Sequence, residues 1–206
     1  MPGRLFLLSP ANTSGLRARQ LTSPRASFDA AVRYRSEEGV AIADAFAFMS
    51  ALYFRGKIGY AMRFAQPPPS IDGCGVYVIA PGFGLVAPDW RLDPPRLRQM
   101  SRTPVDVRKS TYRKPLARDA QSVAALLEHD TEVVLLGSVA TGKYVDILLP
   151  VFGPRLRFPA TFAGLGDMSR GGLMLRAVRE NRELEYTTLD SPRHRAPGGS
   201  GKMPAL

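Results

Sequence analysis

The chain has 206 residues, 45% of them hydrophobic and 22% charged, which favours one globular domain over a two-domain arrangement. The formal net charge of +10 predicts attraction to polyanions and makes nucleic acid the first partner to consider. A single cysteine (Cys74), two histidines (His129 and His194) and the absence of a long apolar run disfavour an internal disulfide, a metal site and a membrane span.

Short apolar runs alternate with helical patterns along the chain. In chain order we predict strands at 5–8, 75–80, 132–136, 157–162 and 183–188, and helices at 27–38, 41–54, 58–65, 118–127, 143–152 and 169–182. Arg55-Gly56-Lys57 is expected to interrupt the helical pattern between 54 and 58. This order predicts a single α/β domain, with a mixed central sheet flanked by helices, over residues 1–190.

Two segments lack such patterns. Residues 87–115 contain five prolines and no clear periodicity, so we expect a long surface connection that contributes nothing to the core. Residues 191–206 are rich in glycine and proline and are expected to be a disordered tail. With no signal peptide in evidence, we expect a cytoplasmic protein without a membrane partner.

Basic residues cluster in the middle of the chain. Residues 91–118 hold nine lysines and arginines against two aspartates, which is +7 of the net +10. A clustered excess is typical of a nucleic-acid footprint, although a solvated face is the common alternative. We predict largely sequence-independent phosphate contacts, with Tyr53 or Tyr112 available to stack on unpaired bases. The predicted contact residues are Arg55, Lys57, Arg91, Arg96, Arg98, Arg102, Arg108, Lys109 and Arg113.

Polar loops follow three of the predicted strands, where α/β proteins bind ligands. The segment from Gly137 to Lys143 matches a phosphate-binding GxxxxGK loop, but Tyr144 stands where Ser or Thr would hold magnesium, which argues against nucleotide hydrolysis. An anion site beside Lys143 and an ordinary strand-to-helix turn both remain open. Gly171-Gly172, early in a helix, indicates close approach of another backbone or of a ligand.

These loops define a candidate pocket for a nucleotide, a nucleobase or another phosphorylated small molecule. Its predicted residues are Ser9, Asn12, Gly82, Gly84, Gly137, Ser138, Gly142, Lys143, Arg170 and Arg176. The sequence identifies no catalytic residue. Ser9 would need Lys143 or an aspartate as its base, because no histidine is placed to serve. We expect no cofactor and no metal.

Five blocks of the sequence, in order, resemble the conserved blocks of the YaaA peroxide-stress family. They are LFLLSPA at 5–11, FRGKIGYAM at 54–62, VYVIAPGFGLVAPDWRLDPPRLRQM at 76–100, VVLLGSVATGKYVDILLP at 133–150 and SRGGLMLRAVREN at 169–181. The resemblance implies a YaaA-like α/β domain that binds DNA, including distorted or partly unpaired duplexes, and protects cells in oxidative stress.

The resemblance also implies a helix-hairpin-helix-like DNA-binding element at 55–59. This chain departs from the family pattern in three places. Its glycines there are three residues apart, Asn12 stands where the family commonly has lysine, and Gly171-Gly172 replaces a single glycine. The resemblance and the basic cluster at 91–118 together make DNA binding the leading hypothesis. The alternatives are an enzyme that acts on a small molecule in the pocket and a scaffold whose 87–115 segment binds an acidic protein.

Overall fold

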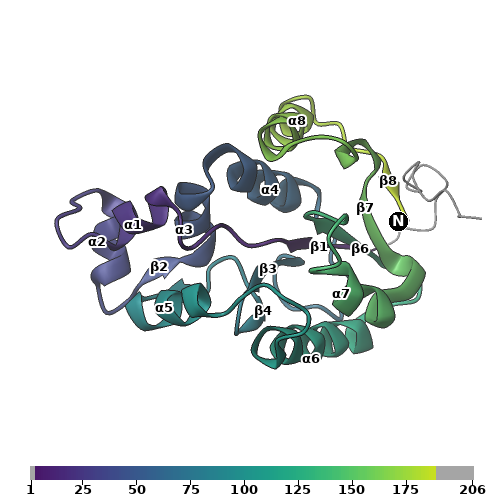
Figure 1. The fold of residues 1–206 in the computed structure, drawn as a ribbon. Coiled ribbons are helices and arrows are strands. Elements are labelled where there is room, and N and C mark those ends of the chain that lie inside the picture. The colour runs from purple at the N-terminus through teal and green to yellow at the C-terminus, as the bar shows by residue number, and fades with distance from the viewer. Residues whose placement is uncertain (1–2, 189–206) are drawn as a thin grey trace, which may run out of the picture.

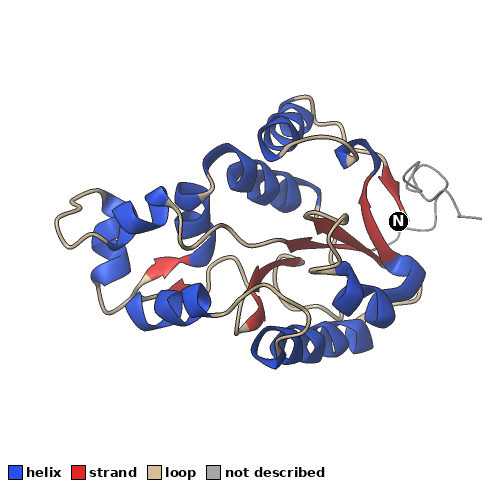
Figure 2. Cartoon of the chain, in the orientation of Figure 1, coloured by secondary structure: helices blue, strands red, loops and turns tan. Residues whose placement is uncertain are grey.

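A six-stranded mixed sheet runs through the centre of the computed structural model, which describes residues 3–188 (Figures 1 and 2). Its strand order is β4-β3-β1-β6-β7-β8. The four inner strands are parallel, and the edge strands β4 and β8 run antiparallel to their neighbours. The strands are β1 (Arg4–Leu8), β3 (Val76–Ala80), β4 (Gly84–Val86), β6 (Glu132–Leu136), β7 (Leu156–Pro159) and β8 (Tyr186–Thr187). The described residues thus form the predicted α/β domain with a mixed sheet flanked by helices.

Helices cover both faces of the sheet, α4 and α8 above it and α6 and α7 below it in Figure 1. The helices are α1 (Leu16–Thr22), α2 (Asp29–Arg35), α3 (Ile42–Met49), α4 (Ala51–Phe64), α5 (Pro94–Arg102), α6 (Ser110–Leu126), α7 (Val145–Phe152) and α8 (Asp167–Arg179). Two 3-10 turns (Gly153–Arg155 and Ala160–Phe162) and a small ribbon of β2 (Val40–Ala41) with β5 (Arg91–Leu92) complete the fold.

Alternation along β1 explains why both faces need helices. Phe6 and Leu8 belong to the core under α4 and α8, whereas Leu5 and Leu7 belong to the core over α6 and α7. All four side chains are fully buried, as expected for a strand in the middle of a parallel sheet. The continuous apolar run therefore predicted this strand correctly, and the predictions for the strands at 75–80 and 132–136 are also confirmed.

The helix break in the first half lies earlier than predicted. It falls at Ser50, where Ala51 has a φ of 42°, and α4 then runs unbroken from 51 to 64 through Arg55-Gly56-Lys57. The predicted interruption at these residues is wrong, and a hairpin at 55–59 is not formed. Gly56 lies inside this helix. Glycine is needed there because its α-carbon faces the backbone of Gly171 in α8, where a side chain would not fit.

The segment 87–115 is more ordered than predicted. Asp93 caps α5 by accepting a hydrogen bond from the Arg96 N–H at 2.8 Å, and Pro94 begins the helix, a favoured position for proline. Leu97 and Met100 of α5 are buried in the core. The expectation that this segment contributes nothing to the core is therefore wrong, because two prolines that suggested a loop instead start a helix.

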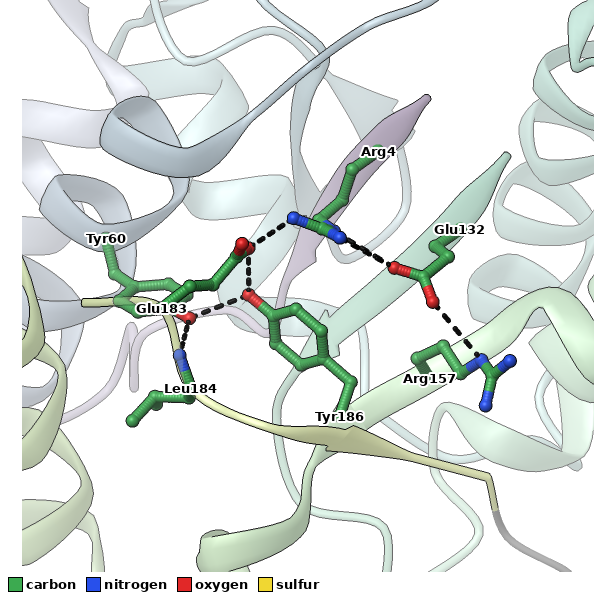
Figure 3. Close-up of polar contacts among 7 residues, drawn as sticks. All are labelled: Arg4, Tyr60, Glu132, Arg157, Glu183, Leu184 and Tyr186. Carbon is green, nitrogen blue, oxygen red and sulfur yellow. Dashed lines mark hydrogen bonds and ion pairs between the residues drawn. The ribbon is translucent and has the colours of Figure 1, made fainter. Parts of the chain in front are cut away.

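A polar network joins the amino end of β1 to the last described strand (Figure 3). The guanidinium of Arg4 pairs with Glu132 at 2.9 Å and with Glu183 at 2.5 Å. The Tyr186 hydroxyl donates to Glu183 at 2.8 Å and lies 2.7 Å from the Tyr60 hydroxyl. The network thus holds the chain after α8 against α4 and the sheet. It lies at the amino ends of β1 and β6, opposite the polar loops at their carboxyl ends.

The predicted tail at 191–206 lies outside the described residues. Among the helices of residues 3–188, none has the length and hydrophobicity to cross a membrane.

Candidate functional site

A lysine is buried against the end of the central strand. Lys57 of α4 is 1% exposed, and its Nζ donates to the backbone oxygen of Ser9 at 2.7 Å and lies 2.9 Å from the Ser9 Oγ. Ser9 directly follows β1, where its N–H and its Oγ both donate to Leu136 O at 3.2 Å. The amine is thereby fixed at the carboxyl ends of β1 and β6.

The surroundings of this amine favour its neutral form. The pKa of Lys57 is lowered to about 7, chiefly by burial, with the Asp167 charge raising it and the Arg170 charge lowering it. No carboxylate of the described residues contacts the amine. Instead, the Nζ lies 4.3 Å from the centre of the Tyr53 ring and 5.0 Å from that of Phe54.

Two buried tyrosines lie near Lys57 and Ser9. Tyr53 is 8% exposed, and its hydroxyl makes no hydrogen bond of ordinary geometry among the residues described. Burial raises the pKa of its phenol, and the nearby Arg170 and Ser9 side chains oppose that shift. Tyr144 is equally buried, and burial raises the pKa of its phenol to about 12. Both phenols therefore stay protonated near neutral pH. An unpaired buried hydroxyl costs about 1–3 kcal/mol, so the Tyr53 hydroxyl is a donor whose partner we expect to be a ligand.

These residues line a cleft of about 440 Å³, a volume typical of small-molecule sites. Its walls come from the loop after β1, from the start of α4, from the loop after β6 and from the start of α8. The lining residues are Ser9, Pro10, Ala11, Asn12, Ser50, Tyr53, Val105, Ser138, Thr141, Lys143, Tyr144 and Asp167. The cleft thus places Ser9 among polar groups, with Lys57 behind it.

Glycines make the arrangement possible at two points. A methyl group at Gly137 would lie 3.0 Å from the Cβ of Ser9 and 3.2 Å from its Oγ, so only glycine leaves Ser9 its present position. A methyl group at Gly171 would lie 2.8 Å from Leu52 O. Tight helix packing therefore accounts for Gly171, and this packing brings the start of α8 to the cleft, while Gly172 faces open space.

The structure brings together part of the predicted pocket. Ser9, Asn12, Ser138 and Lys143 line the cleft, and Gly137 and Gly142 belong to the same β6–α7 loop. Gly137 and Gly142 are not themselves lining residues, and four more predicted residues lie outside both the lining and this loop: Gly82, Gly84, Arg170 and Arg176.

Local packing explains these four positions. Gly82 and Gly84 have positive φ. A methyl group at Gly84 would meet Asp119 and Pro115 of α6, so a helix occupies the space predicted for a ligand. Arg170 donates to Phe162 O at 3.0 Å and acts on Lys57 only through its charge. Arg176 is exposed on α8.

The predicted phosphate contacts do not form one set. Lys57 is in the core, and Arg55 lies on α4, which covers the face of the sheet opposite α6. The remaining residues lie along β5, α5 and the approach to α6. Arg96 packs over Trp90 at 4.7 Å from the ring centre, and Arg108 pairs with Asp106 at 2.7 Å. Five of these predicted contact residues have no carboxylate partner within residues 3–188: Arg91, Arg98, Arg102, Lys109 and Arg113.

The two aromatics suggested for base stacking are not available for it. Tyr53 is 8% exposed and Tyr112 is 1% exposed. Tyr112 is a residue of α6 whose ring lies in the core between that helix and the sheet, and its hydroxyl donates to Lys143 O at 3.1 Å. Tyr112 therefore supports the β6–α7 loop instead of reaching the surface.

Lys57 is the residue of the site whose role the sequence reasoning missed. Its neighbours at helical spacing are Tyr53, Tyr60 and Ala61, so the lysine stands in the middle of a buried apolar stripe. A lysine in such a stripe is a signal for a buried amine. Comparison of the chain with family models, with curated proteins and with solved structures found no match, so the geometry alone carries the functional argument.

Proposed function

We propose that the protein is an enzyme that acts on a small molecule bound in the cleft at the carboxyl ends of β1 and β6. The contact of the buried Lys57 amine with the Ser9 hydroxyl, 2.9 Å away, carries this proposal. Nucleophilic enzymes pair a hydroxyl with a base in this way.

A purely structural role fits this lysine poorly. Buried charges in proteins are generally paired with opposite charges, because removing an ion from water is costly. The amine of Lys57 instead contacts a hydroxyl, a carbonyl and two aromatic rings. An amine whose pKa lies near neutrality and whose partner lines a cleft has the properties of a catalytic base.

The cleft suits a polar ligand. Lys143 supplies a cation, Asp167 an anion, and Asn12, Ser138 and Thr141 supply neutral polar groups. Lys143 also lies just before α7, and the positive end of a helix dipole favours anions. A nucleotide, a nucleobase or another phosphorylated metabolite therefore remains the first class of ligand to test.

A thermal-shift screen with nucleotides, nucleobases and sugar phosphates tests the proposal. A specific ligand at about 100 times its Kd stabilises the folded protein by about 2.7 kcal/mol, which raises the melting temperature. We expect Lys143→Ala to reduce this response and Arg179→Ala, an exposed residue of α8, to leave it unchanged. If no member of the screen stabilises the wild-type protein, the small-molecule proposal loses its support.

A second candidate function is nucleic-acid binding by a YaaA-like protein, as the resemblance implies. The observation in its favour is a hollow of about 220 Å³ beside α5, lined by Arg19, Arg98 and Arg102 together with Thr13, Thr22 and Ser101. Unpaired arginines next to hydroxyl groups are typical of phosphate contacts.

Binding to single-stranded, duplex and bubble DNA at several salt concentrations tests this candidate. Each phosphate contact contributes about −0.9 to the slope of log K against log salt on duplex DNA. We expect Arg98→Glu combined with Arg102→Glu to weaken binding and to reduce the magnitude of the slope by the contribution of about two phosphate contacts. Arg179→Glu should change the affinity and the slope little. An affinity that does not change with salt would contradict the candidate.

A further inference from the structure

We infer that Ser9 is the nucleophile of an acyl-transfer reaction, with Lys57 as its base, and that the cleft takes a small ester or amide as substrate. This inference rests on the proposed function, because it assigns a reaction to the same cleft. It is carried by the positions of the hydroxyl, the amine and the surrounding donors.

The two reacting groups stand at the distance that proton transfer needs. The Lys57 Nζ lies 2.9 Å from the Ser9 Oγ, within the range of a catalytic hydrogen bond. The same nitrogen donates to Ser9 O at 2.7 Å. A neutral amine has two N–H bonds and one lone pair, so when one N–H points to Ser9 O its lone pair can face the Ser9 Oγ. The Ser9 proton, which points to Leu136 O at 3.2 Å, must rotate about the Cβ–Oγ bond to reach that lone pair.

The second requirement is a lysine that is neutral when the substrate arrives. Lys57 is 1% exposed and has no contacting carboxylate among the described residues. The groups that face it are Ser9 at the end of β1, Tyr53 and Phe54 on its own helix, Tyr144 in the β6–α7 loop, and the charges of Asp167 and Arg170 on α8. The two α8 charges oppose one another, which leaves burial as the dominant influence.

The reaction balances with water as the only co-reactant. Ser9 Oγ attacks the carbonyl carbon while its proton passes to the Lys57 Nζ, and a bond from Oγ to carbon forms. The tetrahedral species collapses, the bond to the alcohol or amine breaks, and the leaving group takes the proton from Lys57. Water then attacks acyl-Ser9, gives one proton to Lys57, and releases the carboxylic acid as Ser9 recovers that proton.

Donors for the carbonyl oxygen come from the cleft itself. The Asn12 Oδ1 accepts from the N–H and the Oγ of Ser14 at 3.0 Å and 2.9 Å, so the amide nitrogen is the end of Asn12 left for a ligand. The hydroxyl of Tyr53 makes no hydrogen bond of ordinary geometry among the residues described, and Lys143 lines the same cleft. Such donors stabilise the negative charge that develops on oxygen during attack.

Labelling with phenylmethylsulfonyl fluoride, followed by intact-mass measurement and peptide mapping, tests the inference. Sulfonylation needs an activated hydroxyl and releases fluoride, so the adduct reports nucleophilicity without knowledge of the substrate. We expect one adduct per chain on Ser9, at least about a hundredfold slower modification of Ser9→Ala, and no change in Ser122→Ala, a serine exposed on α6. We also expect p-nitrophenyl acetate to give a burst of p-nitrophenol that Ser9→Ala abolishes.

The role of Lys57 has its own readouts. The labelling rate of the wild-type chain should rise as pH increases through about 7 and then level off, because the neutral amine is the base. Lys57→Met should slow labelling at least about a hundredfold while circular dichroism shows a folded chain. If that variant does not fold, the wild-type pH profile decides: a rate that is flat from about pH 6 to about pH 8 overturns the role of Lys57.

The outcomes separate this inference from the proposed function. No adduct on Ser9, or equal labelling of Ser9→Ala, overturns acyl transfer. If a ligand of the thermal-shift screen still stabilises the protein and Lys143→Ala removes that effect, the cleft binds a small molecule and only the acyl-transfer reaction fails. If neither an adduct nor a ligand response is found, both proposals fail.

Discussion

Gly56 of α4 and Gly171 of α8 lie backbone against backbone. A methyl group at Gly56 would lie 2.7 Å from Gly171 O, and one at Gly171 would lie 2.9 Å from the α-carbon of Tyr53. This contact lets α8 pack close over the turn of α4 that carries Lys57. The charges of Asp167 and Arg170 thereby come within reach of the buried amine.

We predict that Gly171→Ala destabilises the protein by about 1–3 kcal/mol, because the added methyl group meets backbone that has no room to move. The adjacent Gly172 provides the control, since a methyl group there meets nothing within 4 Å. Gly172→Ala should stabilise the protein by up to about 1 kcal/mol through helix propensity. Urea unfolding of both variants measures the difference, and equal effects would contradict the close packing.

The stability contribution of Lys57 should depend on pH. The pKa of its amine is lowered from 10.5 to about 7 in the folded protein, so the unfolded chain binds more protons between these values. Wild-type stability relative to Lys57→Met should therefore rise with pH from 7 toward 10.5, by up to about 1.4 kcal/mol per pH unit. Below pH 7 the full penalty of burying the ammonium should remain.

Urea unfolding of the wild-type chain and of Lys57→Met at about pH 6 and about pH 9 measures this linkage. Because both chains share every other titrating group, the difference between them isolates Lys57. A difference that stays constant with pH would show that the amine keeps its ordinary pKa, and one that falls as pH rises would show a raised pKa; either contradicts the prediction.

The Arg4 network should stabilise the fold more than an exposed ion pair does. The Arg4 side chain is 14% exposed and holds both Glu132 and Glu183. Its removal leaves Glu183 without its cation and Glu132 with only the Arg157 guanidinium, 3.7 Å away. We expect Arg4→Met to cost about 1–3 kcal/mol. Arg33→Met, which removes an exposed pair with Asp29 on α2, should cost less than about 1 kcal/mol. Thermal unfolding of both variants tests the contrast.

Gly137→Ala should affect reactivity more than stability. The methyl group would press on Ser9 at 3.0–3.2 Å and displace its hydroxyl from the Lys57 amine. We expect Ser9 sulfonylation to slow by about tenfold to a hundredfold and stability to fall by about 1 kcal/mol. Gly172→Ala should leave the labelling rate unchanged. Normal labelling of Gly137→Ala would mean that the position of Ser9 does not depend on this glycine.

The sequence predicted the centre of the fold because the evidence for it is local. The continuous apolar runs at 5–8, 75–80 and 132–136 correspond to the central parallel strands β1, β3 and β6. Both faces of these strands are buried. Parallel strands end at one edge, so the polar loops after β1 and β6 were correctly expected to meet there. Ser9, Asn12, Ser138 and Lys143 follow from that reasoning and line the cleft.

Only the tertiary structure shows which basic residues are exposed and which are buried. Lys57 and Arg55 are two residues apart, and composition alone treats them as equivalent cations. In the fold Arg55 is exposed and Lys57 is buried, because the helix turns the lysine toward β1 and Gly56 admits α8 beside it. The amine and the Ser9 hydroxyl are 48 residues apart in the chain.

Local sequence patterns therefore determined the class of fold, the central strands and the edge of the sheet at which the cleft lies. The tertiary structure alone decided which amine stands beside Ser9, because burial and pKa depend on elements that are distant in sequence. Strand patterning is a property of neighbouring residues, whereas the desolvation of one amine requires a helix, a strand and a second helix to pack around it.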